Sequence, residues 1–122
     1  MAGLLAAVAA SLAVASALHL SGHVHGRGAP FDADHAGVAE AVIGMVLAAA
    51  AVAMVRAPAR ARTIGVAATS FATAGFLLGL SITTRGGDAP DIAYHLTVLP
   101  ILVASLVVMV RGGEKVASPR TG

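Results

Sequence analysis

The stretch that decides the fold is AGLLAAVAASLAVASALHL at residues 2–20, which contains no Asp, Glu, Lys or Arg. Its length matches the roughly 20 apolar residues that an α-helix needs to cross the hydrocarbon core of a bilayer. Similar segments follow at residues 36–55, 63–82 and 92–110. Among the four segments only residues 36–55 contain an acid, Glu40. Helices are expected because lipid leaves the backbone groups of an open strand without hydrogen-bond partners.

The composition of the whole chain excludes a soluble domain. Of the 122 residues, 57% are hydrophobic and 11% are charged, and the mean hydropathy is +0.86. A soluble domain of this size exposes much of its surface to water, so each helix needs a polar stripe, which these segments lack. The sequence therefore predicts an all-α integral membrane four-helix bundle. It forms one domain over residues 1–122, and residues 111–122 form a flexible cytoplasmic tail.

The first apolar segment also resembles a signal peptide in one respect. The small-residue motif ASA at residues 15–17 is typical of the position before a signal-peptidase cut. A signal peptide, however, carries positive charge ahead of its apolar stretch, and MAGLLAAVAA carries none. We therefore expect this segment to be kept as a membrane helix.

One short phrase occurs twice in the chain. APFDADH at residues 29–35 and APDIAYH at residues 89–95 both read Ala-Pro-x-x-Ala-x-His, sixty positions apart. Proline suits the first turn of a helix, where its missing N–H has no partner in any case. The repeat predicts two tandem helical hairpins, about 1–60 and 61–120, related by an axis along the membrane normal as a parallel repeat.

This alignment makes two histidines equivalent. His35 and His95 end the two phrases, so we expect them at the same depth near one membrane surface. His19 closes the first apolar segment at a similar depth. It aligns with Gly79, so its position is not duplicated.

The basic residues predict the orientation. Six of the eight lie in the middle connection or the C-terminal tail: Arg56, Arg60, Arg62, Arg111, Lys115 and Arg120. The other two connections contain only Arg27 and Arg85. By the positive-inside rule both termini are cytoplasmic, and the histidine-bearing loops are extracytoplasmic.

All five histidines then lie on the outer side: His19, His23, His25, His35 and His95. Imidazole is the commonest metal ligand, so His35, His95 and His19 are candidate ligands for a transition metal or for haem. His23 and His25 would point to one side of an extended segment and could bind Cu(II), Ni(II) or Zn(II). Asp91, four residues before His95, could fix the orientation of that ring. The alternative is that these histidines are interfacial residues bonded to backbone.

Glu40 and three glycines are the remaining candidate residues within the apolar segments. An ionisable group inside a span is costly and faces the bundle interior, so Glu40 is either a functional acid or a hydrogen-bonded structural residue. Gly44 lies on the face of Glu40, and Gly75 and Gly79 form a G-x-x-x-G motif. Such small residues favour close helix packing within the chain or with another protein.

Three classes of function fit this sequence. The absence of cysteine excludes thiolate sites, and the lack of catalytic motifs argues against an enzyme. The lack of a Lys/Arg stripe argues against nucleic-acid binding. The size of the chain favours a small accessory or assembly subunit that packs with partner membrane proteins or with itself. The alternatives are an outer-face transition-metal or haem-binding protein, and a minimal ion- or proton-coupled transporter that acts as an oligomer, with Glu40 as the coupling acid.

Overall fold

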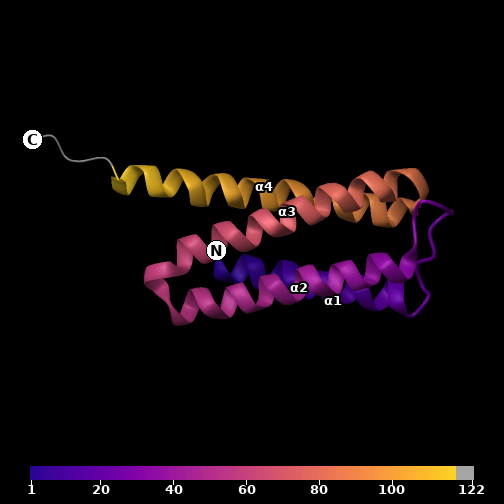
Figure 1. The fold of residues 1–122 in the computed structure, drawn as a ribbon, viewed down its shortest axis with the longest axis horizontal. Coiled ribbons are helices and arrows are strands. Elements are labelled where there is room, and N and C mark those ends of the chain that lie inside the picture. The colour runs from indigo at the N-terminus through magenta and orange to yellow at the C-terminus, as the bar shows by residue number, and fades with distance from the viewer. Residues whose placement is uncertain (118–122) are drawn as a thin grey trace, which may run out of the picture.

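The structure, a computed structural model, describes residues 1–117, with side chains described as far as residue 112. Its elements are α1 (Ala2–Leu20), α2 (Ala33–Arg56), a 3-10 turn η1 (Pro58–Arg60), α3 (Ala61–Gly86) and α4 (Ala89–Ala117) (Figure 1). Residues 118–122, the end of the predicted tail, lie outside the described part. All four α-helices are long and apolar enough to cross a membrane, and residues 1–117 contain no strand. The predicted all-α membrane fold is confirmed.

α1 has the bounds predicted for it, whereas the other three helices are longer than the apolar segments that predict them. α2 begins at Ala33 because the Asp32 side chain accepts a hydrogen bond from the backbone N–H of His35 and so caps the helix. α4 continues to Ala117, past the predicted end of the span at residue 110. An apolar segment shows only which part of a helix suits the lipid core. The helix itself can continue into the polar residues on either side, because its backbone hydrogen bonds do not require apolar side chains.

The helices pair as two hairpins, α1 with α2 and α3 with α4, and α2 also contacts α3. In Figure 1 the α1–α2 connection (residues 21–32) lies at the same end of the bundle as the α3–α4 turn. The N-terminus, η1 and the last turns of α4 lie at the opposite end. The pairing agrees with the predicted hairpins and places Arg56, Arg60 and Arg62 at the end opposite the α1–α2 connection.

Small residues let the helices approach closely. A Cβ atom added at Gly44 of α2 would lie 3.3 Å from Leu12 Cβ of α1, and one at Gly75 of α3 would lie 2.6 Å from Ile43 Cδ1 of α2. Larger side chains fill the space between these contacts, and Leu5, Leu12, Leu47, Leu102 and Thr69 are fully buried. Gly44 and Gly75 therefore lie where helices pack, as small residues do in membrane bundles.

The two copies of the repeated phrase adopt different local structures. Pro30 lies in a turn ahead of α2, whereas Pro90 lies in the first turn of α4. His35 is therefore in the first turn of its helix, with 90% of its side chain exposed. His95 lies one turn deeper in its helix and is buried. The alignment of His35 with His95 does not give these two residues equivalent surroundings.

The α1–α2 connection is bound to the α3–α4 turn. The backbone N–H groups of Arg27 and Gly28 donate to the Gly86 carbonyl over 2.6 and 3.2 Å, and that of Gly26 donates to Asp88 Oδ2 over 3.1 Å. Gly26 and Gly28 have φ angles of 72° and 139°, which favour glycine. These bonds join the two hairpins at one end of the bundle.

Gly86→Ala tests this junction. A Cβ atom at residue 86 would overlap the Gly28 carbonyl oxygen, so the connection would have to move away from the turn. We expect a loss of about 1–3 kcal/mol in the free energy of unfolding, as for other overpacked sites, measured by denaturant titration in detergent. Gly112→Ala, where a Cβ atom would meet nothing within 4 Å, is the matched control. Equal stability of the two variants would show that the junction is not tight.

Candidate functional site

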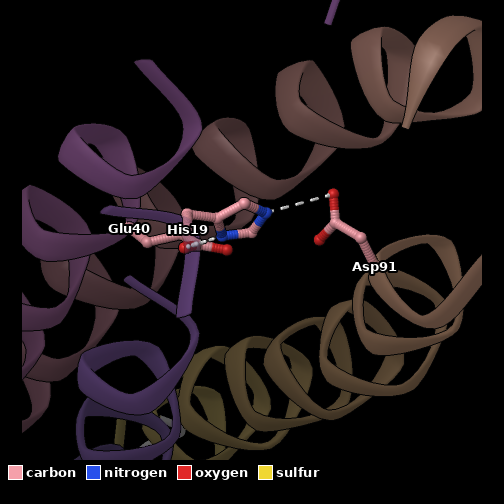
Figure 2. Close-up of side chains that lie close together, drawn as sticks. All are labelled: His19, Glu40 and Asp91. Atoms are coloured by element: carbon pink, nitrogen blue, oxygen red, sulfur yellow. Dashed lines mark hydrogen bonds and ion pairs between the residues drawn. The ribbon is translucent and has the colours of Figure 1, made fainter. Parts of the chain in front are cut away.

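Four ionisable side chains from three helices meet inside the bundle, next to the α1–α2 connection. They are His19 of α1, Glu40 of α2, and Asp91 and His95 of α4, with exposed fractions of 3%, 6%, 5% and 8%. Figure 2 shows the His19 ring between the two carboxylates. Burying ionisable groups in an apolar bundle is costly unless each has a partner, so the contacts of each atom matter.

The His19 ring is oriented through its Nδ1 atom. This atom lies 2.8 Å from Glu40 Oε2 and 3.0 Å from the Ala15 carbonyl oxygen. A backbone carbonyl oxygen can accept a hydrogen bond but cannot donate one, and the same is true of an ionised carboxylate. The hydrogen of the neutral ring is therefore on Nδ1. In the neutral ring the other nitrogen, Nε2, then has a free lone pair.

His19 Nε2 and Asp91 Oδ2 face each other at 3.8 Å, which is too long for a hydrogen bond (Figure 2). Neither atom has a hydrogen-bond partner within the described residues, and both are buried. With Nδ1 protonated and Asp91 ionised, two acceptors share one dry space. A cation between them would satisfy both, and two ligands of a tetrahedral metal ion lie about 3.4 Å apart.

Asp91 is oriented by His95. The Nδ1 atom of His95 lies 3.3 Å from Asp91 Oδ1 and 3.0 Å from the Asp91 carbonyl oxygen. The ring packs against Phe76 at 5.2 Å between centroids. A Cβ atom at Gly79 would lie 2.7 Å from His95 Nε2, so the glycine of α3 provides the space for this ring. Gly79, predicted as a helix-packing residue, thus contacts the site directly.

The cluster has the composition of a metal site. His19, Glu40 and Asp91 each offer a ligand atom, and these three atoms lie within 4.8 Å of one another. Glu40 Oε1 is also buried without a hydrogen-bond partner among the described residues. Imidazole nitrogen and carboxylate oxygen together suit borderline divalent ions such as Zn(II), Ni(II) and Cu(II).

The other predicted site residues lie outside this cluster. His35 is exposed, and its Nδ1 atom lies 3.5 Å from Asp32 Oδ1. The His35 backbone N–H, which donates to the Asp32 carboxylate, lowers the pKa of Asp32 below its ordinary value. His23 and His25 are exposed in the α1–α2 connection, where His23 Nδ1 lies 2.8 Å from Ser21 Oγ. The structure therefore does not bring His35, His23 or His25 to the buried histidines.

Two features of the site were not predicted from the sequence. Glu40 pairs directly with His19, and Phe31 of the α1–α2 connection packs on the His19 ring at 5.8 Å between centroids. The contact between Glu40 and His19 could have been anticipated, because an acid buried in a membrane span generally needs a polar partner. No sequence pattern indicated the second, since it depends on how the connection folds back over the helix ends.

Comparison with known proteins supplies no further guide to this site. No protein-family model matches the chain, and neither a curated protein nor a solved structure matches it. The chemistry of the cluster therefore has to be judged from its own geometry. That geometry is two oriented acceptor atoms in a dry space, each held by a second ionisable group.

His19→Ala tests how strongly the bundle depends on this ring. The variant leaves the Glu40 and Asp91 carboxylates buried with no imidazole between them, so we expect a loss of about 3–5 kcal/mol in the free energy of unfolding. His35→Ala removes an exposed ring and should change it by less than about 0.5 kcal/mol. Denaturant titration in mixed micelles measures both, and similar losses for the two variants would contradict the central place of His19.

Proposed function

We propose that this protein binds a divalent transition-metal ion, such as Zn(II), inside the membrane-spanning bundle. The observation that carries the proposal is the pair of buried, unpartnered acceptors, His19 Nε2 and Asp91 Oδ2, at 3.8 Å. A hydrogen bond at that distance cannot stabilise the pair, whereas coordination to a shared ion can. The two atoms are only slightly farther apart than the roughly 3.4 Å that separates two ligands of a tetrahedral ion.

Each of the four side chains has a role in this proposal. His19 Nε2 and Asp91 Oδ2 bind the ion in this proposal, and Glu40, the third member of the cluster, stays on the Nδ1 side of the His19 ring. Glu40 Oε2 also fixes the tautomer of His19 through Nδ1, and His95 fixes the Asp91 carboxylate through Oδ1. Metal-binding histidines are commonly oriented by such a carboxylate. The two carboxylates together balance the double positive charge of the ion.

The ligand chemistry favours a divalent ion over Cu(I). Soft Cu(I) prefers sulfur ligands, and the chain has no cysteine. Met54 and Met109 contact the position of Gly65 near the start of α3, and Met45 is 65% exposed. These methionine sulfurs are directed elsewhere, so the described cluster offers only nitrogen and oxygen.

The site belongs at the extracytoplasmic end of the bundle in this proposal. The basic residues at the opposite end favour a cytoplasmic location for η1 and both termini. Five of the six acids of the chain lie at this end, in the two connections or in the adjoining turns of α2 and α4, and they attract cations from the outer solution before any specific contact forms. The ion then enters from the side of His23 and His25.

The accessory-subunit and transporter functions remain predictions. Large apolar side chains are exposed on all four helices, for example Val14 of α1, Met45 of α2, Leu78 of α3 and Val108 of α4. Lipid contact alone requires such a distribution, so no single face of the described residues favours a protein partner. The buried cluster is the more specific feature, and the metal site is therefore preferred.

Metal binding is tested on purified protein in lipid nanodiscs by elemental analysis and by titration with Zn(II). We expect about one ion per chain, and a loss of at least about tenfold in affinity for Glu40→Gln, which keeps the size of the side chain. His19→Ala and Asp91→Asn should bind less still. His23→Ala and His35→Ala, which change exposed rings, are the controls and should bind as the parent does. No binding by the parent protein, or equal binding by all variants, would contradict the proposal.

The orientation is tested with single cysteines, because the native chain has none. Cysteine at Ser21 or Thr84, both exposed at the site end, should react with a membrane-impermeant maleimide in intact cells. Cysteine at Ala59, exposed in η1, should react only after the membrane is permeabilised. The reverse pattern would place the metal site on the cytoplasmic side.

A further inference from the structure

A groove of about 400 Å³ runs between α1 and α4 and ends at the buried cluster. Val14 and Leu18 of α1 and Pro90 of α4 line its apolar part, and Val14 and Leu18 are 62% and 42% exposed. His19 and Asp91 line its inner part. The groove therefore connects the lipid-facing surface with the two side chains that hold the proposed ion.

The inner end of the groove is polar in an unusual way. When the His19 ring is neutral, His19 Nε2 and Asp91 Oδ2 are both acceptors, and both atoms are buried without hydrogen-bond partners among the described residues. The neighbouring hydroxyls of Tyr94 and Ser11 are hydrogen-bonded to each other over 2.9 Å, so these two groups of the lining already have partners. The inner end of the groove therefore offers a ligand hydrogen-bond acceptors, or an ion bound to them. The described lining offers it no free hydrogen-bond donor.

We infer that the groove binds a membrane-dissolved amphiphile with a hydroxyl head, its apolar chain lying along Val14 and Leu18. This inference rests on the proposed metal site. His19 Nε2 and Asp91 Oδ2 supply two ligands, which leaves a tetrahedral ion open positions on the side of the groove. A hydroxyl oxygen fills one of these positions, and its hydrogen is donated to a carboxylate oxygen of the cluster.

The chemistry of the site selects the head group. A carboxylate or phosphate head would add negative charge beside Glu40 and Asp91, which already balance a divalent ion. An ether or ester oxygen could reach the ion but could not donate a hydrogen bond to an acceptor there. The volume lies within the range of small-molecule sites, and the lining that faces lipid suits a single alkyl chain.

The chain contains its own reporter for this groove. Tyr94, which lines it, is the only tyrosine, and there is no tryptophan. A brominated alkyl chain in contact with Tyr94 quenches its fluorescence. The probe is a bromine-labelled dodecanol, titrated into Zn(II)-loaded protein in lipid vesicles, which add no aromatic residue, and the control probe is the methyl ether of the same compound.

We expect the alcohol to quench saturably at a membrane concentration about tenfold below that of the ether, because only the alcohol can donate a hydrogen bond to the cluster. Val14→Phe, which fills the groove, should raise the concentration of alcohol needed for half-quenching. Val38→Phe changes an exposed valine on α2 that does not line the groove and should leave it unchanged. Thermal unfolding of both variants confirms that they are folded.

Two results would overturn this inference while leaving the metal site intact. One is equal quenching by the alcohol and the ether in protein that elemental analysis shows to hold zinc. The other is equal behaviour of Val14→Phe and Val38→Phe. A preference for the alcohol in protein that binds no zinc would instead support the groove and contradict the metal proposal, since the hydroxyl would then donate directly to the two acceptors.

Discussion

The imidazole of His19 lies between two carboxylates that come from different helices, and the arrangement of the bundle depends on this contact. Its Nδ1 atom lies 2.8 Å from Glu40 of α2, and its Nε2 atom faces Asp91 of α4 across 3.8 Å, so one ring is in reach of acids from both hairpins. In an apolar bundle none of these groups can turn to water, and each must be satisfied by its neighbours or by an ion. The contact therefore limits what the site can bind, while the bonds of the α1–α2 connection to Gly86 and Asp88 hold the two hairpins together at this end.

Several small structural features make this contact possible. Ser16 Oγ donates to the Gly37 carbonyl over 2.7 Å and fixes the register of α1 against α2. A Cβ atom at Gly37 would lie 3.1 Å from His19 Cβ, so glycine there lets the helices approach beside the ring. Gly79 gives His95 its space, and Phe31 covers His19 from the α1–α2 connection. The same residues that pack the bundle thus bury the cluster, and a low local dielectric strengthens hydrogen bonding and ion binding there.

Much of the fold could be predicted from the sequence, because the hydropathy and length of a segment are local properties that decide whether it can cross a lipid bilayer. The four helices followed from them, the two hairpins were predicted from the repeated phrase, and Glu40 was expected to face inward because an acid inside a span is costly. The site was less accessible. His19, Glu40 and Asp91 were each predicted as candidate residues. Whether they contact one another depends on how each helix is rotated about its axis, and four nearly uniform apolar segments give little indication of that rotation. The repeat also suggested that His35 matches His95. However, α2 starts after Pro30, at the Asp32 cap, whereas α4 starts before Pro90, so His35 lies in an exposed first turn. Helix caps depend on single hydrogen bonds that a pattern of similar letters does not reveal.

The most direct measurement of the central claim is the X-ray absorption spectrum of the zinc-loaded protein in a lipid bilayer. The account predicts a shell of nitrogen and oxygen ligands at about 2.0–2.1 Å, without sulfur, together with the multiple-scattering signal of imidazole. That imidazole signal should be lost in His19→Ala and kept in His35→Ala. A shell of water oxygens alone, or an imidazole signal that survives in His19→Ala, would contradict it.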